Sequence, residues 1–222
     1  GLALLFSALT PCILFSMGSP EAVRACLAQV ELPDEVYLSI PEAHLPAVAA
    51  YYHFDNDPSG EGRYGIWPMW RMALRSTAPL PNAPQAPVVR LGPDDAPRIQ
   101  ALYAHGGPFT PDAFDAYQLE DGVFFGVVEG GGELAAVGGT HIVDWSAGLA
   151  TIGNMYTRPD CRGRGLAGAV LRAIVGELRA RRVEIIALNV DQRNDRARRL
   201  YERHGFEIHC GFLEGVGRRR EL

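Results

Sequence analysis

Lysine is absent from the sequence, and all 21 basic residues are arginine, a bias to which we attach no function. Cysteine is scarce. The 4 cysteines form no C-x-x-C pair and show no spacing typical of metal ligands, so the sequence predicts no metal site. Scattered cysteines in a chain of 222 residues are typical of proteins kept in a reducing compartment. We therefore expect a cytoplasmic protein.

Long apolar runs are also missing. Residues 1–15 are apolar, but Pro11 interrupts them, and a membrane-spanning helix needs about 20 such residues. The stretch lacks the basic start and the small-residue cleavage site that are typical of a secretory signal peptide. We expect it to form core in a first lobe, and we predict no association with a membrane.

The net charge of -5 is distributed unevenly along the chain. Residues 158–222 carry 15 arginines against nine acidic residues, and the rest of the chain is strongly acidic. A locally basic region on an acidic protein suits a small polyanionic ligand better than a nucleic acid. We therefore predict no nucleic-acid partner. Because 47% of the residues are hydrophobic, the chain can bury a proper core.

A proline-rich segment, residues 77–87, divides the chain and is predicted to be a stiff linker. Residues 1–76 are predicted to form a small α/β lobe, and residues 88–222 a larger α/β domain with a mixed central sheet flanked by helices. In the lobe we expect helices from Ser19-Pro20 and over 42–52, and strands over 36–40 and 64–74.

The larger domain is predicted from alternating periodicities. The expected strands are 88–91, 122–129, 134–143, 149–156, 183–190 and 207–212. The expected helices are 94–104, one that begins at Thr110-Pro111 and ends near Leu119, one that follows Gly165, and one that Asn194 caps.

The strongest chemical signal lies between the strand 149–156 and the helix that follows it. The loop there contains Arg162, Gly163, Arg164 and Gly165. A glycine-rich turn that opens a helix presents unpaired backbone N–H groups, and the helix dipole adds partial positive charge. Because glycine has no Cβ, a ligand can approach this backbone closely. The pattern predicts a phosphate-binding site.

Two phosphate ligands are consistent with this loop. Gly163, Gly165 and Gly168 satisfy the G-x-G-x-x-G fingerprint of dinucleotide-binding proteins. In that fingerprint the first glycine follows the strand directly, whereas here residues 158–162 intervene. Asp191 lies farther along the chain than the roughly 20 residues expected for the ribose-binding acid. The dinucleotide interpretation is therefore the weaker one.

The alternative explains more of the chain. Arg162-x-x-Gly165-x-Ala167 resembles the R/Q-x-x-G-x-G/A signature of the GNAT superfamily of N-acetyltransferases. Downstream, Asn194-x-x-Ala197-x-x-Leu200-Tyr201-x-x-x-Gly205-Phe206 resembles a second element of the same superfamily. The resemblance covers residues 88 to about 217. It implies the α+β acetyltransferase fold and acetyl-CoA as the cofactor.

The resemblance also implies a set of cofactor-binding residues. The backbone of the loop would hold the pyrophosphate of coenzyme A, and the strand before it would pair with the pantetheine arm. The residues carried over in this way are Met155, Tyr156, Thr157, Arg162, Gly163, Arg164, Gly165, Leu166, Ala167, Gly168, Asn194 and Tyr201.

Two further segments narrow the resemblance. Residues 135–141 and 152–157 resemble the glycine N-acyltransferase-like branch, in which a degenerate N-terminal lobe precedes the catalytic domain. The first lobe has no R-x-x-G-x-A loop, so we expect it not to bind coenzyme A.

The resemblance implies that Tyr201 is the acid that protonates the leaving thiolate. A tyrosine has a reference pKa of about 10 and a thiol of about 8.5, so the phenol is protonated at neutral pH. His141 is the candidate base, with a reference pKa of about 6.5 that suits proton removal. Asn154 is a candidate for orienting the amine, and Asp144 or Glu214 for removing its proton through water.

These observations predict an enzyme that transfers an acetyl group to a primary amine of a small molecule or amino acid. Two alternatives remain open at this point: a coenzyme A-binding module that has lost catalysis, and an acetyltransferase that modifies proteins. Neither the identity of the amine nor the oligomeric state is predicted.

Overall fold

The computed structural model describes residues 1–7, 10–55, 64–74, 80–81, 86–112 and 114–221. The chain forms two compact units. Unit 1 comprises residues 1–70 and 210–222, and unit 2 comprises residues 71–209. The sequence-based division at 76 and 88 stays a prediction, and most of the predicted linker, 77–79 and 82–85, lies outside the described residues.

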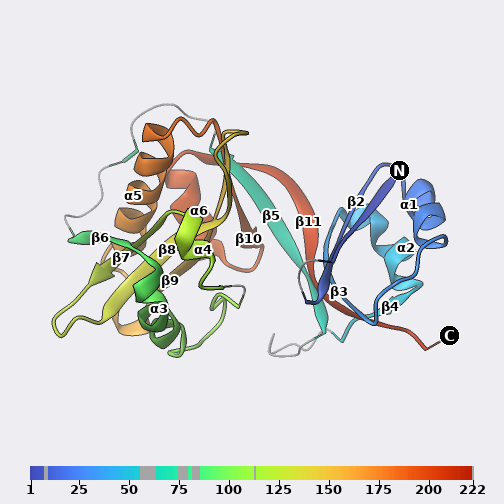
Figure 1. Cartoon of the computed structure of the whole chain (residues 1–222), viewed down its shortest axis with the longest axis horizontal. Coiled ribbons are helices and arrows are strands. Elements are labelled where there is room, and N and C mark those ends of the chain that lie inside the picture. The colour runs from blue at the N-terminus through green and yellow to red at the C-terminus, as the bar shows by residue number, and fades with distance from the viewer. Residues whose placement is uncertain (8–9, 56–63, 75–79, 82–85, 113, 222) are drawn as a thin grey trace. The chain divides into compact units, whose positions relative to one another are not determined.

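Unit 1 is an α/β unit whose strands run in the order β1-β2-β3-β11 (Figure 1). The strands β2 and β3 are parallel, with helix α1 between them, while β1 and β11 are antiparallel to their neighbours. Its elements are β1 (Leu2–Phe6), β2 (Cys12–Met17), α1 (Pro20–Leu27), β3 (Glu35–Ile40), the short 3-10 helix η1 (Glu42–His44), α2 (Leu45–Ala49) and β4 (Tyr52–His53).

The start of α1 confirms its predicted cap. Ser19 Oγ accepts the N–H of Ala22 at 3.3 Å, and Pro20 occupies the first helical position. Residues 1–15 were expected to be core, and the structure is more specific: one side of β1 is partly buried against the core through Ala3 and Leu5, while Leu2, Leu4 and Phe6 are between 45% and 50% exposed. The alternation of a strand places successive side chains on opposite faces, which accounts for this division.

Two strands, β5 (Gly65–Leu74) and β11 (Phe206–Arg219), contribute residues to both units. Within unit 2 the strand order is β5-β10-β9-β8-β7-β6. Its remaining elements are β6 (Val88–Leu91), η2 (Pro93–Asp95), α3 (Ala96–Tyr103), α4 (Gln118–Asp121), β7 (Phe124–Val128), β8 (Leu134–Asp144), β9 (Leu149–Thr157), η3 (Pro159–Cys161), α5 (Leu166–Ala180), β10 (Ile185–Asp191) and α6 (Asp195–Arg203).

Helices cover both faces of the sheet in unit 2 (Figure 1). On one face, Ile99 and Leu102 of α3 pack with Phe124, Val137 and Tyr156 in a single buried cluster. On the other face, α5 contacts β7, β8 and β9 and buries an apolar stripe that includes Val170 and Ile174. The mixed sheet flanked by helices confirms the predicted fold class.

One predicted helix is wrong. The sequence predicted a helix from Thr110 to Leu119, but the only helix described there is α4, which begins at Gln118. Polar side chains bind the backbone in ways that compete with a helix. The hydroxyl of Thr110 donates to the carbonyl of Gly107 at 2.8 Å, and the carboxylate of Asp115 accepts the N–H of Tyr117 at 3.2 Å.

Candidate active site

The predicted phosphate loop joins β9 to α5. The short helix η3 follows β9, and the loop then reaches Gly165, the N-cap of α5. Gly163 and Gly165 both have positive φ angles, of 85° and 78°. This left-handed conformation is costly for a residue with a Cβ, which explains why the loop requires glycine at these positions.

The loop leaves a row of backbone N–H groups available. The N–H of Cys161 donates to Arg158 O at 2.9 Å, and the first bond of α5 runs from Ala169 N–H to Gly165 O at 3.1 Å. Between them, residues 163–168 have N–H groups that make no hydrogen bond to any described residue. No side chain caps α5. Free N–H groups at the positive end of a helix form an anion-binding site.

The arginines of the loop are engaged elsewhere. Arg162 Nε donates to Thr157 O at 3.1 Å, and its guanidinium lies 5.9 Å from the centre of the Tyr156 ring. Arg164 forms an ion pair with Glu129, at the end of β7. The same carboxylate accepts Arg158 Nη2 at 2.9 Å. The sequence did not predict Glu129 as a partner, and the geometry favours the backbone over Arg164 as the anion-binding element.

Glu129 and Asp160 hold the base of the loop. Asp160 accepts Arg158 Nε at 2.7 Å, and Arg164 and the thiol of Cys161 hydrogen-bond to Glu129, which lowers the pKa of that carboxyl. Burial raises the pKa of the Cys161 thiol, and the side chain of Cys161 is buried. The thiol is therefore a structural donor in this cluster rather than a nucleophile.

A free strand edge lies beside the loop. The parallel ladder between β9 and β10 begins at Leu149 with Ile185 and ends at Ile152 with Leu188. Beyond Ile152, β9 pairs with β8 on one side, and no described strand pairs with its other side. Apart from the carbonyls of Asn154 and Thr157, which accept Tyr103 and Arg162, the backbone of residues 153–157 is thus open to an extended ligand, because an unpaired strand edge presents N–H and C=O groups. Met155, Tyr156 and Thr157 belong to this edge.

The edge begins at an irregularity of the sheet. The register between β8 and β9 shifts twice, between Val137 and Gly139 and between Thr140 and Ile142. Asn154 adopts a positive φ of 56°, which is rare for a residue other than glycine. Such bulges re-aim side chains and often lie next to active sites.

Two glycines at this irregularity leave room for neighbouring side chains. A Cβ on Gly153 would lie 1.7 Å from Cδ2 of His141. A Cβ on Gly138 would lie 2.1 Å from Sδ of Met155. The ring of His141 therefore lies directly over Gly153, and it can keep this position only because Gly153 has no side chain.

We expect Gly153→Ala to lower the free energy of unfolding by about 1–3 kcal/mol and to displace His141, since the added methyl overlaps the imidazole. Chemical denaturation measures the first effect, and the ¹H–¹³C spectrum of the histidine rings reports the second. The matched control is Gly176→Ala, because a Cβ on Gly176 meets nothing within 4 Å and helix propensity favours alanine. Equal stability of the two variants would contradict the overlap.

A buried polar cluster joins this strand to α4. Asn154, 3% exposed, donates through Nδ2 to Gln118 Oε1 at 3.0 Å. Gln118 Nε2 lies 3.5 Å from Nδ1 of His141. The hydroxyl of Tyr103 donates to the carbonyl of Asn154 at 2.8 Å, and burial raises the pKa of that phenol. The side-chain oxygen of Asn154, Oδ1, is buried and has no hydrogen-bond partner among the described residues.

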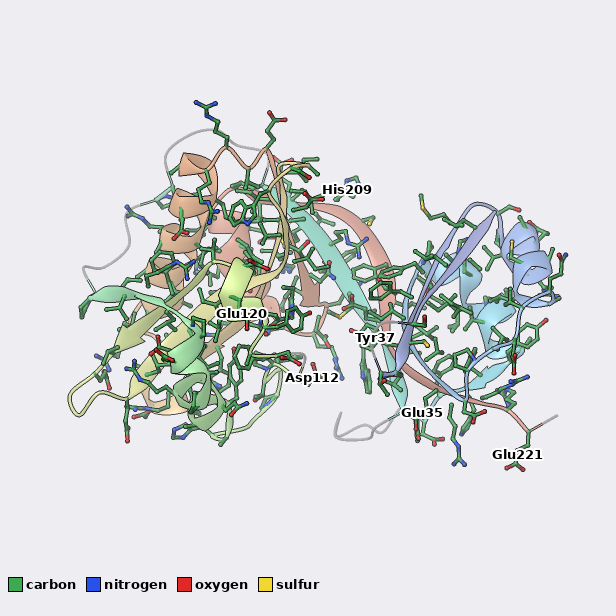
Figure 2. The ribbon with its side chains drawn as sticks, in the orientation of Figure 1. Glu35, Tyr37, Asp112, Glu120, His209 and Glu221 are labelled. Atoms are coloured by element: carbon green, nitrogen blue, oxygen red, sulfur yellow. The ribbon has the colours of Figure 1, made fainter. Side chains whose placement is uncertain are left out.

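His141 is half-buried. Burial lowers the pKa of its imidazole, and the negative charge of Asp112 partly opposes this shift. Asp112 comes from the segment ahead of α4, and Glu120 from α4 itself (Figure 2). His141 is therefore neutral at pH 7. Its assignment as the base stays a prediction.

The alternative bases differ in their surroundings. Asp144 accepts the N–H groups of Ser146 and Ala147 and the hydroxyl of Ser146, all through Oδ1 within 2.9 Å. These hydrogen bonds lower the pKa of Asp144 and make it a turn-forming residue. Glu214, the other alternative base, belongs to unit 1, whereas Asp144 belongs to unit 2.

Tyr201 lies on α6, whose cap matches the prediction. Asn194 Oδ1 accepts the N–H of Ala197 at 3.1 Å, and Gly205 ends the helix with a φ of 83°. The ring of Tyr201 is buried and lies edge-on to Phe206, with 6.0 Å between ring centres. Burial raises the pKa of the Tyr201 hydroxyl, so the phenol stays protonated through neutral pH.

The first turn of α5 packs against α6. A Cβ on Gly168 would lie 3.4 Å from Cε1 and Nε2 of His204 and 3.7 Å from Leu200. The loop residues and the helix that carries Tyr201 are thus brought together. Within the described chain, no hydrogen bond or ring contact links Tyr201 with His141.

Sequence reasoning missed Gln118, Tyr103 and Gly153. No motif marks them, because their roles depend on contacts between β9, α3 and α4, which are far apart in the sequence. Among the described residues, no group of three or more His, Cys, Asp or Glu side chains is placed to hold a metal ion. In the same part of the chain, no helix is long and apolar enough to span a membrane.

Solved structures share this fold. A putative acetyltransferase of the GNAT family from Novosphingobium aromaticivorans is 25% identical, with a TM-score of 0.64 over 93% of this chain and 84% of that one. A GCN5-related N-acetyltransferase-like protein from Streptococcus suis is 15% identical, with a TM-score of 0.59 over 98% of this chain and 83% of that one. The second similarity concerns the fold alone.

A curated relative is similar in sequence. Mycothiol acetyltransferase from Thermobispora bispora is 33% identical in an alignment of 157 residues that covers 62% of this chain. The match covers 53% of that relative, so the chain spans about half of its length.

The model of the acetyltransferase (GNAT) family matches residues 95–206, about half of the chain. This range contains the free edge of β9, the glycine loop, Asn194 and Tyr201. The chain therefore belongs to the GNAT acetyltransferase family.

Proposed function

We propose that the protein transfers an acetyl group from acetyl-CoA to a primary amine of a small molecule or amino acid. Members of the family use acetyl-CoA as the co-substrate. The observation that carries the proposal is the combination of the free edge at residues 153–157 with the row of free N–H groups at residues 163–168.

The two features suit the two ends of one ligand. The N–H groups at the start of α5 would bind the pyrophosphate, with the dipole of a 15-residue helix behind them. The edge of β9 would pair with the amide groups of the pantetheine arm, as a strand edge pairs with an extended peptide. When bound, acetyl-CoA supplies the acetyl group as a thioester, whose transfer to nitrogen releases a thiolate.

In this proposal the protein's own groups handle the protons. Tyr201 holds a proton at its hydroxyl, because burial keeps the phenol neutral, and gives it to the departing sulfur. The phenol regains its proton from solvent. The amine reacts in its neutral form, and its proton leaves to water. Each turnover then forms one C–N bond and breaks one C–S bond, and the proton that the neutral amine loses to water balances the proton that the phenol takes from solvent.

The test is calorimetric titration with acetyl-CoA, coenzyme A and NAD in parallel, followed by thiol release with a panel of amines. We expect micromolar binding of the first two ligands, no binding of NAD, and turnover with at least one small amine. Binding of NAD alone would overturn the assignment. Tight binding of coenzyme A without turnover of any amine or peptide would instead favour a module that has lost catalysis.

The finer assignments are part of the same proposal. Placement in the glycine N-acyltransferase-like branch stays a prediction, as does the expectation that the first lobe, residues 1–76, does not bind coenzyme A. Small amines are favoured over protein acceptors because the polar groups beside the edge of β9 are buried, as the exposure of 3% at Asn154 illustrates. Turnover of peptides but not of small amines would reverse this choice.

A further inference from the structure

The side-chain amide of Gln118 has one defined orientation. Its Oε1 lies 3.2 Å from the backbone N–H of Asp115, which can only donate. The atom facing that N–H is therefore the oxygen. The same oxygen accepts Nδ2 of Asn154 at 3.0 Å, which orients the amide of Asn154 in turn.

This orientation determines where His141 carries its proton. With Oε1 of Gln118 directed at Asp115 and Asn154, the amide nitrogen Nε2 faces Nδ1 of His141, 3.5 Å away. An amide nitrogen donates and does not accept. Nδ1 of a neutral His141 is consequently the acceptor, and the proton of the ring is on Nε2.

The protonated nitrogen lies where the free edge of β9 starts. A Cβ on Gly153 would lie 2.1 Å from Nε2 of His141, so this nitrogen is beside Gly153, the residue that follows the last β9–β10 pair at Ile152. A nitrogen that carries a proton cannot take the proton of an attacking amine. At this position the imidazole is a hydrogen-bond donor.

A second observation concerns the neighbouring side chain of Asn154. Asn154 Oδ1 is buried and has no partner among the described residues, although its amide nitrogen is held by Gln118. A buried oxygen without a partner has lost its hydrogen bonds to water, and an N–H of a ligand would restore one. His141 thus offers a hydrogen-bond donor and Asn154 offers an acceptor, and the side-chain amide of Gln118 contacts both residues.

We propose that these two groups recognise an acceptor that carries both an amine and an oxygen, as an amino acid does. Asn154 Oδ1 accepts an N–H of the amine, and His141 Nε2–H donates to the carboxyl or carbonyl oxygen. Gln118 is the positioning residue that fixes the tautomer of His141. The inference about the substrate class rests on the proposed acetyl transfer, whereas the inference about the tautomer of His141 does not.

The first test needs no activity. The ¹⁵N shifts of the His141 ring distinguish the Nε2–H tautomer from the Nδ1–H tautomer in the full chain at pH 7. Gln118→Glu is nearly isosteric and keeps oxygen acceptors for Asp115 and Asn154, but it replaces the donor to His141 by an acceptor. We expect Nε2–H in the parent protein and protonation of Nδ1 in the variant. Nδ1–H in the parent protein would overturn the inference even if the enzyme were active.

The second test uses alanine and ethylamine, which is alanine without its carboxyl group. We expect His141→Ala to raise the KM for alanine about tenfold, since it removes one hydrogen bond to the substrate. The KM for ethylamine should stay within about twofold of its value in the parent protein. His141→Gln places an amide N–H near the position of Nε2 without a basic nitrogen, so it should restore most of the affinity for alanine.

Three results would contradict the proposal. Equal losses of kcat for both amines in His141→Ala would indicate action at the thioester or as a base. If His141→Gln recovered no turnover of alanine and its pH–rate profile lost the acidic limb, His141 would be a base. If neither amine is turned over, titration of alanine should still shift the His141 Nε2 resonance, and no shift would exclude the recognition role.

Discussion

Gly165→Glu is expected to weaken acetyl-CoA binding by at least about 100-fold, which corresponds to about 2.7 kcal/mol. Gly165 is the N-cap of α5 with a φ of 78°, at the centre of the free N–H groups of residues 163–168. A glutamate there places a side chain where the ligand must approach the backbone and a negative charge where the phosphates would lie. Calorimetry with acetyl-CoA measures the loss.

Two variants separate the causes of that loss. Gly176→Glu introduces the same charge in the same helix, at an exposed position where a Cβ meets nothing within 4 Å, and should leave the affinity unchanged. Gly165→Ala tests strain alone, because a left-handed alanine costs roughly 1–2 kcal/mol without adding charge. Gly165→Ala should therefore reduce the affinity for acetyl-CoA by less than Gly165→Glu does. If acetyl-CoA bound Gly165→Glu as tightly as the parent protein, the loop would not be the phosphate site.

The parts of the site that were predicted correctly are those with a local cause. Gly163 and Gly165 indicate left-handed backbone because only glycine adopts it at little cost, and the structure has positive φ at both. Asn194 indicates a helix start because its side chain binds an N–H three residues ahead, and it does so. Such features depend on a few neighbouring residues, so the sequence alone predicts them.

The parts that were missed depend on contacts between distant segments. Glu129 follows β7 and reaches Arg164, 35 residues away, and nothing near either residue indicates the pair. Gln118 connects Asn154 and His141 only because α4 packs on β8, and the sequence predicted a different helix for that region. The orphan oxygen of Asn154 appears only when burial is known.

Tyr201→Phe is expected to lower kcat about 100-fold and to leave the affinity for acetyl-CoA within about twofold. The substitution removes the proton that the proposed mechanism delivers to the departing sulfur and keeps the ring that lies edge-on to Phe206. Because burial raises the pKa of the hydroxyl above its ordinary value of about 10, the parent enzyme should show no loss of kcat from Tyr201 as the pH rises from 7 to 9.

Tyr52→Phe in unit 1 is the matched control for this loss. Tyr52 is also buried, its hydroxyl donates to Pro33 O at 3.0 Å, and burial raises its pKa to about 12. Removing that hydroxyl should cost about 1 kcal/mol of stability and leave kcat unchanged, because the lost hydrogen bond is structural. Stopped-flow detection of thiol release measures kcat for both variants, and calorimetry measures their affinity for acetyl-CoA. A Tyr201→Phe enzyme with full kcat would show that the departing sulfur takes its proton from water, and the role of Tyr201 would then be packing against Phe206.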